Sequence, residues 1–148
     1  MLEENFARQF TAAMDCHGLA LGQALTQSVG PLLGDRQLVL DIDGDPVIYA
    51  NTLVTAHPHL RAMVLDQSPV DALGRTAIKS HEVSDRVEVV RANMFTDPWP
   101  TADIHLLSNV LHNWDIPELR TLLQRSADSL APGGLVIIHE VFINDDKT

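Results

Sequence analysis

Residues 38–47 read Leu38-Val39-Leu40-Asp41-Ile42-Asp43-Gly44-Asp45-Pro46-Val47, an apolar run that leads into acids and a glycine-containing turn. The residues that follow, 48–56, have the pattern of a helix. A strand, a turn and a helix in this order form the repeating unit of a parallel α/β sheet. Ligands of such sheets bind beyond the carboxyl ends of the strands, where the next helix begins. We therefore expect the turn after Asp41 to lie at the functional edge of the protein.

The rest of the chain repeats the alternation of apolar strands and helices. Strands are expected at residues 37–42, 62–65, 86–91, 103–108 and 135–141. Helices are expected at residues 6–14, 19–33, 48–56, 68–81 and 117–130, with Gly30-Pro31 interrupting or ending the second and Pro132-Gly133-Gly134 stopping the last. Uninterrupted apolar strands are typical of a parallel sheet that is covered on both faces. The sequence predicts the α/β class, as a Rossmann-like three-layer α/β/α sandwich with a mostly parallel sheet.

Length and charge limit the class of partner. The 148 residues fit one domain, with leading helices in residues 1–35 and the core in residues 36–148. The 10 basic and 20 acidic residues give a formal charge of −10, which argues against nucleic acid and anionic membranes as partners. Cys16 is the only cysteine, so no disulfide can form within the chain. The acidic start and the lack of a long apolar run favour a cytoplasmic protein.

Six segments of the sequence, taken together and in order, form a pattern that is more specific to one protein family than any of them is alone. They are residues 38–44, 56–66, 85–90, 93–95, 107–114 and 132–140. The set resembles the small-molecule O-methyltransferases that use S-adenosylmethionine, of the bacterial antibiotic-pathway and plant phenolic type. The most discriminating part is Leu111-His112-Asn113-Trp114, followed by a Pro-Gly-Gly turn and a strand that ends in Glu140. The resemblance spans residues 6–148 and implies the class I methyltransferase fold without its last strands.

The resemblance implies a catalytic pair. His112 matches the family's base, which takes a proton from an acceptor hydroxyl while the methyl group is transferred. Glu140 matches the carboxylate that orients this histidine and stabilises its charged form. The two residues follow the fourth and fifth strands, so we expect their side chains to meet. The alternative interpretation is that His112 only caps the loop and helix that begin at Asp115.

The resemblance also implies residues around the adenosyl part of the cofactor. Asp66, at the end of the second strand, matches an acid that accepts hydrogen bonds from both ribose hydroxyls. Asn93 and Met94 match the pair beside the adenine, with Met94 packed on the ring. The alternatives are an ordinary acid at a strand end for Asp66, and plain core residues for Met94 and Phe95.

The loop expected around the methionine part of the cofactor departs from the family. Relatives have a turn of the form Asp-x-Gly-Gly-Gly-x-Gly, because glycine lets the backbone approach the cofactor closely. Here only Asp41 and Gly44 match, and together with Ser108 they complete the implied cofactor set. Asp43 and Asp45 add negative charges that favour the sulfonium and repel the cofactor's carboxylate. The same departure favours the alternative that the chain is a non-catalytic binding or assembly subunit.

The family also has an N-terminal dimerisation domain and two further C-terminal strands that these segments do not match. We expect a truncated product with one exposed sheet edge, which a second copy of the chain, as a homo-oligomer, is one candidate to cover.

Two further interpretations concern metal ions. Asp41-Ile42-Asp43-Gly44 resembles the first motif of Mg²⁺-dependent haloacid-dehalogenase-like phosphatases, in which the first aspartate attacks phosphorus. The other residues that this chemistry requires are hard to place, because Lys79 lies within a helix and Asp145-Asp146 at the end of the chain. His57-Pro58-His59 lacks a third ligand and is expected to be a solvated turn. No metal site is therefore predicted.

Overall fold

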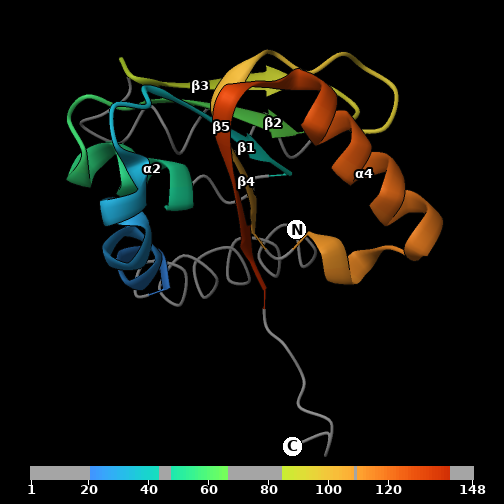
Figure 1. The fold of residues 1–148 in the computed structure, drawn as a ribbon, viewed down its shortest axis with the longest axis horizontal. Helices are drawn as coiled ribbons and strands as arrows, with labels where there is room; N and C mark the ends of the chain where they lie inside the picture. Colours follow the sequence, from blue (N-terminus) through green and yellow to red (C-terminus); the bar gives the residue numbers. More distant parts are fainter. Residues whose placement is uncertain (1–20, 44–47, 67–84, 109, 141–148) are drawn as a thin grey trace, which may run out of the picture.

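The computed structural model describes residues 21–43, 48–66, 85–108 and 110–140. Its strands are β1 (Leu38–Ile42), β2 (Arg61–Asp66), β3 (Val87–Arg91), β4 (Ala102–Ser108) and β5 (Leu130–His139). They form one parallel sheet in the order β3-β2-β1-β4-β5 (Figure 1). The chain moves outward from β1 to β3 and then crosses back to β4, so β1 and β4 flank the point where the strand order reverses. Ligands of open α/β sheets bind in the crevice at such a point.

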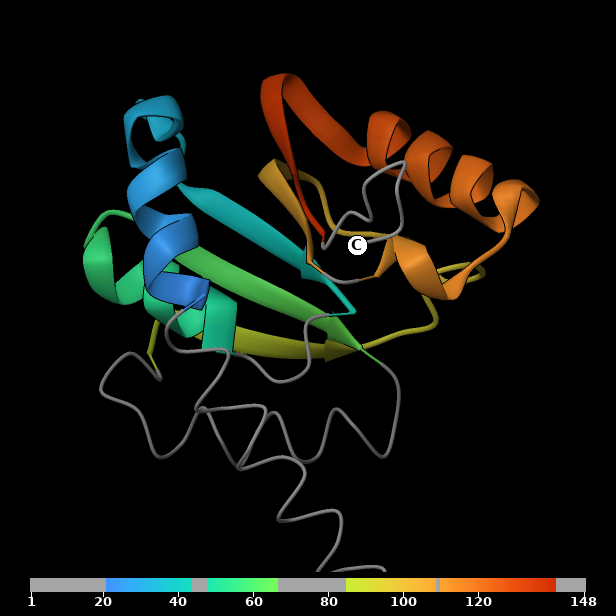
Figure 2. The same ribbon diagram turned by 90° about the horizontal axis from the view of Figure 1, so that it is seen from below.

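Helices cover both faces of this sheet. Residues 21–33 are helical, α2 spans Ile48–Ala56, α4 spans Ile116–Ser129, and a short 3-10 helix, η1, spans Leu111–Asn113. Figure 2 shows the helix of residues 21–33 and α2 on one side of the sheet and α4 on the other. The predicted α/β class and the parallel sheet are therefore confirmed. The helices expected at residues 6–14 and 68–81 lie outside the described residues.

Neighbouring residues of a strand pack on opposite sides of the sheet. Val39 belongs to a buried cluster with Leu53 of α2, whereas Leu40 belongs to a second cluster with Leu122 of α4. All four side chains are at most 1% exposed. Because both faces are covered, the strands need apolar residues at every position rather than at alternate ones.

The helix of residues 21–33 corrects one expectation. It passes through Gly30-Pro31 and ends at Leu33, followed by Gly34 in the left-handed conformation at φ 57°. Proline removes only one backbone hydrogen bond near the end of a helix. Val29 and Leu33 are buried in the core at 7% and 2% exposure, and this packing holds the last turn in place.

The start of β5 corrects the expectation that Pro132-Gly133-Gly134 stops the preceding helix. The strand begins at Leu130, directly after α4, and contains Pro132-Gly133-Gly134 instead of following it. The register with β4 shifts here, since Ala102 pairs with Leu130 and Ile104 with Leu135. Gly133 has φ 74°, and a Cβ on Gly134 would lie 2.5 Å from the Leu130 side chain. The glycines therefore form an irregularity inside the strand rather than a helix stop.

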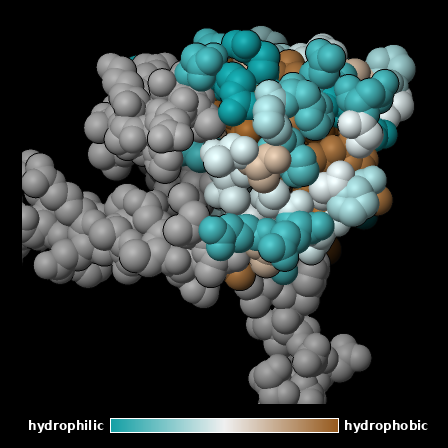
Figure 3. Space-filling model, turned by 90° about the vertical axis from the view of Figure 1, so that its left-hand side faces the viewer, coloured by the Kyte–Doolittle hydropathy of each residue, from teal (hydrophilic) through white to brown (hydrophobic). Residues whose placement is uncertain are grey.

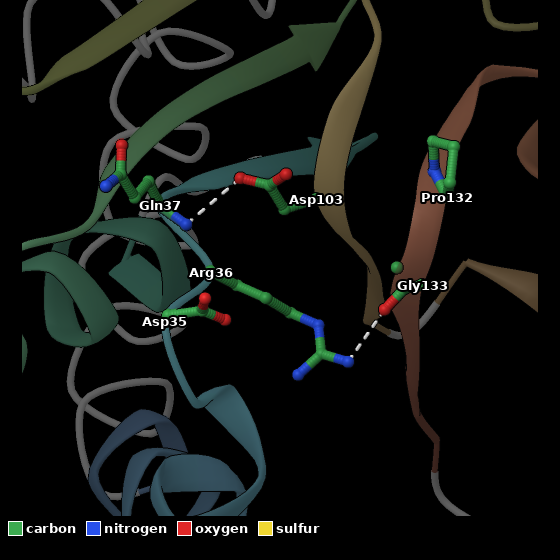
Figure 4. A pocket seen from close by; sticks show the side chains of 7 residues that line it. Asp35, Arg36, Gln37, Asp103, Pro132 and Gly133 are labelled. Carbon is green, nitrogen blue, oxygen red and sulfur yellow. Dashed lines mark hydrogen bonds between the residues drawn. The ribbon is translucent and has the colours of Figure 1, made fainter.

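Hydrogen bonds hold the amino ends of the central strands together. Asp103 Oδ2 accepts hydrogen bonds from the backbone N–H groups of Gln37 and Leu38, both at 3.0 Å. Arg36 donates to the last carbonyls of the helix of residues 21–33 and, at 2.8 Å, to the Gly133 carbonyl of β5 (Figure 4). A cavity of about 390 Å³ lies here, lined by Asp35, Arg36, Gln37, Asp103, Pro132, Gly133 and Gly134. We call the hydrogen bonds of Arg36 to Leu32, Leu33 and Gly133 the Arg36 clamp.

The described part of the surface is mostly hydrophilic on the side shown in Figure 3, with hydrophobic side chains in smaller patches. Val136 and Ile138 of β5, which forms one edge of the sheet, are 38% and 45% exposed. The expectation that a second copy covers this edge stays a prediction. Within the described ranges, no helix is long and apolar enough to cross a membrane.

Candidate functional site

The ends of β4 and β5 bring the predicted catalytic pair together. Ser108 and His139 are register partners at these ends, and Glu140 follows immediately. Glu140 Oε1 accepts hydrogen bonds from the backbone N–H groups of Val110 and Leu111 at 2.8 and 2.7 Å. Its second oxygen, Oε2, lies 3.0 Å from Nδ1 of His112. The predicted contact between Glu140 and His112 is confirmed.

Glu140 and His112 differ in how much of each side chain is exposed to solvent. The Glu140 side chain is only 5% exposed, and the two backbone amides hold one of its oxygens in place. The carboxylate accepts from Nδ1–H of His112, which leaves the lone pair on Nε2. The His112 side chain is 56% exposed. In the described part of the chain, the imidazole bonds to Glu140 and makes no hydrogen bond to the first turn of α4.

The aromatic residue of the same motif lies against a neighbouring loop. The ring of Trp114 meets the ring of Phe95 edge-on, with centroids 4.7 Å apart. Phe95 lies on the loop between β3 and β4, whereas Trp114 follows η1. Aromatic pairs of this geometry stabilise the contact beyond simple burial. The pair therefore ties the His112 segment to the loop that carries Asn93 and Met94.

Three carboxyl groups at the ends of β1 and β2 lie near enough for their charges to interact. Asp41 is fully buried, and within the described structure neither of its oxygens has a hydrogen-bond partner. Burial raises the pKa of Asp41 well above its usual value, and the charges of Asp66 and Asp43 raise it further. Asp66 ends β2 and is 5% exposed. A fully buried carboxyl group without a partner is costly, and a polar or cationic ligand would relieve that cost.

Asp43 takes a conformation that suits glycine. Its φ is 58°, in the left-handed region, which aspartate tolerates better than most residues. Its backbone N–H donates to the Leu65 carbonyl at 2.8 Å, and its side chain hydrogen-bonds to Asp66. The remainder of the loop, including the predicted cofactor residue Gly44, lies outside the described residues.

The loop after β3 holds Asn93 and Met94 by local hydrogen bonds. Asn93 Oδ1 accepts from the Phe95 backbone at 2.9 Å, and the Asn93 backbone N–H donates to Asp97 at 2.7 Å. Met94 is 5% exposed within the core, and its carbonyl accepts a hydrogen bond from Trp99 Nε1 at 2.9 Å. Burial agrees with the alternative that Met94 is a core residue. Contacts of either residue with an adenine stay predictions.

One polar residue of this edge was not anticipated from the sequence. His139 Nδ1 lies 2.8 Å from Oγ of Ser108, which is 9% exposed. The His139 ring also meets the ring of Tyr49, at the start of α2, edge-on at 5.4 Å. The available signal was the position of His139, which interrupts an apolar strand one residue before Glu140. His139 thereby holds the Ser108 side chain at the end of β4.

The phosphatase interpretation gains no support from this geometry. Asp41 is fully buried and cannot reach a phosphate ester as a nucleophile without rearrangement. Among the residues that the structure describes, no three His, Cys, Asp or Glu side chains are grouped so that they could hold a metal ion. Lys79 and Asp145-Asp146 lie outside those residues.

Comparison with known proteins gives one consistent result. Residues 1–148 match the model of the O-methyltransferase domain. The tetracenomycin polyketide synthesis 8-O-methyltransferase of Streptomyces glaucescens is 31% identical over 141 residues, which are 95% of this chain and 41% of that protein. The 3-hydroxy-5-methyl-1-naphthoate 3-O-methyltransferase of Streptomyces sahachiroi is 32% identical over 143 residues, 96% of this chain and 36% of that protein.

Solved structures that resemble this chain are also methyltransferases. The S-adenosylmethionine-dependent methyltransferase SibL, in its apo form, superposes with a TM-score of 0.80 at 32% identity, over 99% of this chain and 42% of that one. The O-methyltransferase NcsB1 from neocarzinostatin biosynthesis, in complex with S-adenosyl-L-homocysteine, gives a TM-score of 0.66 at 32% identity, over 70% of this chain and 34% of that one. The chain thus spans less than half the length of these proteins.

Proposed function

The chain belongs to the family of O-methyltransferase domains, and from this premise we propose that it forms the cofactor-binding and catalytic part of an enzyme that methylates a hydroxyl group of a small molecule with S-adenosylmethionine. The observation that carries the proposal is the contact of His112 with Glu140, a carboxylate that two backbone amides fix in place. The relatives named for polyketide and naphthoate O-methylation make a phenol or naphthol the acceptor of choice.

In this mechanism, His112 acts as the general base. Nδ1–H donates to Glu140, so Nε2 carries the lone pair that takes the proton from the acceptor hydroxyl. Glu140 then stabilises the imidazolium that forms, because its negative charge lies 3.0 Å from Nδ1. The backbone bonds from Val110 and Leu111 keep the carboxylate oriented, so the base needs no rearrangement during the reaction.

The residues at the ends of β1 and β2 fit an adenosyl cofactor. Asp66 would accept from the ribose hydroxyls, since one carboxylate can accept from both groups of a diol. Asp41 is fully buried beside Asp43 and Asp66, so it would contact the cationic part of the cofactor only after a local rearrangement. When bound, S-adenosylmethionine would supply the methyl group on a sulfonium. Asn93 retains its carboxamide N–H groups and one further lone pair on Oδ1 for the adenine edge.

The test compares His112→Gln with His59→Gln, a matched change of an exposed histidine far from the pair. Transfer of a radiolabelled methyl group from S-adenosylmethionine to a panel of phenols and naphthols is the measurement. We expect His112→Gln to reduce the rate by about 10²- to 10⁴-fold and to leave binding of S-adenosylhomocysteine unchanged. Equal rates for both variants would remove His112 from the mechanism.

A second candidate function is a non-catalytic binding or assembly domain. It is favoured by Asp43, a charged side chain in a glycine-like conformation beside Asp66. The triple variant Asp43→Gly, Asp45→Gly, Val47→Gly separates the two candidates. If cofactor binding appears only in the triple variant, the native chain is a methyltransferase fold that has lost its cofactor. Binding by the native chain supports the enzyme.

A further inference from the structure

Asp43 has no part in the proposed methyl transfer, yet the structure holds it firmly against the end of β2. Its backbone N–H donates to Leu65 O at 2.8 Å, which places residue 43 beside residue 66. The backbone of Asp43 is left-handed, with φ 58°, and its carboxyl group lies within hydrogen-bonding reach of the Asp66 carboxyl. Asp43 therefore lies where a ribose hydroxyl of the cofactor would hydrogen-bond to Asp66.

A hydrogen bond between two carboxyl groups requires a proton, because an ionised carboxylate can only accept. The neighbouring charges favour keeping that proton. Asp41 is fully buried beside the pair, and α2 has no acidic residue in its first turn and no basic residue in its last turn. Arg91, the register partner of Asp66 on β3, is exposed to solvent. Other titratable or charged groups lie at the same edge of the described sheet as the pair of Asp43 and Asp66. They are Asp41 from β1, Arg91 from β3, Tyr49 from α2, His112 from η1, His139 at the end of β5, and Glu140 directly after it.

We propose that Asp43 and Asp66 share one proton in the free protein, and that the ribose hydroxyls of the cofactor displace Asp43 from Asp66 and release this proton to solvent. This inference rests on the proposed cofactor function and adds a proton to its binding equilibrium. Before binding, one O–H bridges the two carboxyl groups. Afterwards, the Asp66 carboxylate accepts from the two ribose hydroxyls, and Asp43, now hydrated, ionises.

The electrostatics of Asp43 agree with this exchange. Burial raises the pKa of Asp43, although the hydrogen bond to Asp66 acts in the opposite direction. Displacement into water removes the burial and returns the group toward ordinary aspartate behaviour. A ligand whose binding releases a proton binds more tightly as pH rises. Affinity should therefore rise by up to about tenfold per pH unit over the range in which the pair holds its proton.

The first measurement is calorimetric titration of the chain with S-adenosylhomocysteine, from pH 5 to 8, in pairs of buffers with different ionisation enthalpies. The dependence of the apparent enthalpy on the buffer counts the protons released. We expect a release that approaches one proton at the acidic end, together with affinity that rises with pH. Measurable binding with no proton release throughout would overturn the proposal.

Three variants make the result specific. Asp43→Asn tolerates the left-handed backbone and keeps an N–H donor toward Asp66, but it cannot release a proton. Its proton release should vanish while binding persists. Asp43→Gly removes the displaced group altogether, so it should bind several-fold more tightly at low pH, without proton release. Asp35→Asn, an exposed carboxyl at the opposite end of the sheet, should behave like the native chain.

A readout without cofactor separates this inference from the proposed function. In the free protein, the Cγ signal of Asp66, followed by carbon-detected NMR, should titrate in two coupled steps. In Asp43→Asn it should titrate in one step at lower pH. Identical Asp66 titrations would overturn the shared proton. Different titrations, with no cofactor binding by the native chain or either Asp43 variant, would instead overturn the cofactor function and with it the release on binding.

Discussion

Glu140 and Asp41 are both buried carboxyl groups at the carboxyl edge of one sheet, and their surroundings are opposite. Glu140 has two backbone amides and the His112 imidazole as partners, all within 3.0 Å. Asp41 has no hydrogen-bond partner in the part of the chain that the structure describes, and other carboxyl groups surround it. The β4–β5 side of the site is therefore complete in the free chain. On the β1–β2 side, Asp41 is left without a hydrogen-bond partner among the described residues, which is costly unless something that binds supplies one.

The largest effect should come from removing the satisfied carboxylate. Glu140→Ala leaves two buried backbone N–H groups and the His112 ring without their acceptor, which should lower the free energy of unfolding by about 3–5 kcal/mol. Glu140→Gln keeps an acceptor oxygen for the amides and should lose less than half of that. Urea denaturation measures both. Equal losses would mean that the backbone bonds do not account for the stability of this side.

A third buried titratable group, His105, has a hydrogen-bond partner for one of its two ring nitrogens. His105, in the middle of β4, is fully buried, and its Nδ1 lies 2.7 Å from Ser126 Oγ. Burial lowers the pKa of His105 to about 4, so the folded state resists protonation.

The unfolded chain binds this proton at higher pH, so stability should fall by up to about 3 kcal/mol as pH drops from about 6.5 to 4. Asp41 opposes this trend, because its raised pKa makes the folded state take up a proton first as pH falls. The difference in unfolding free energy between the native chain and His105→Asn, measured against pH, isolates the histidine. A flat difference would contradict the expected linkage.

The smallest effect, with the opposite sign, should come from the unsatisfied carboxyl. Asp41→Asn removes a buried ionisable group that has no described partner, so it should stabilise the chain by about 1–2 kcal/mol at pH 8. The gain should disappear under acidic conditions in which Asp41 is already protonated. The same change should weaken binding of S-adenosylmethionine more than binding of S-adenosylhomocysteine. A destabilised variant would show that Asp41 is satisfied after all.

The sequence was sufficient for the parts of the molecule that follow from burial and strand order. Apolar runs placed the strands, and the family resemblance together with the neighbouring strand ends predicted the contact of His112 with Glu140. It was insufficient where packing overrides local preference. Pro31 stays helical because Leu33 is anchored in the core, and Gly133 and Gly134 lie within β5 rather than ending α4.

The remaining surprises depend on contacts between distant residues. A motif shows that Asp43 replaces a glycine, but only the register of β1 with β2 puts its side chain against Asp66. Similarly, His139 could be noticed as a polar residue in an apolar strand, whereas its bond to Ser108 needs the pairing of β4 with β5.

The Arg36 clamp has a consequence for how the protein folds and unfolds. Its bond to Gly133 joins residues that are 97 positions apart in the chain. Closing so long a loop is entropically costly, so we expect the contact to form late in folding, after the sheet that lies between its two ends. Interactions that form after the transition state leave the folding rate almost unchanged and slow unfolding. We therefore expect Arg36 to lengthen the lifetime of the native state and to have little influence on how fast the chain reaches it.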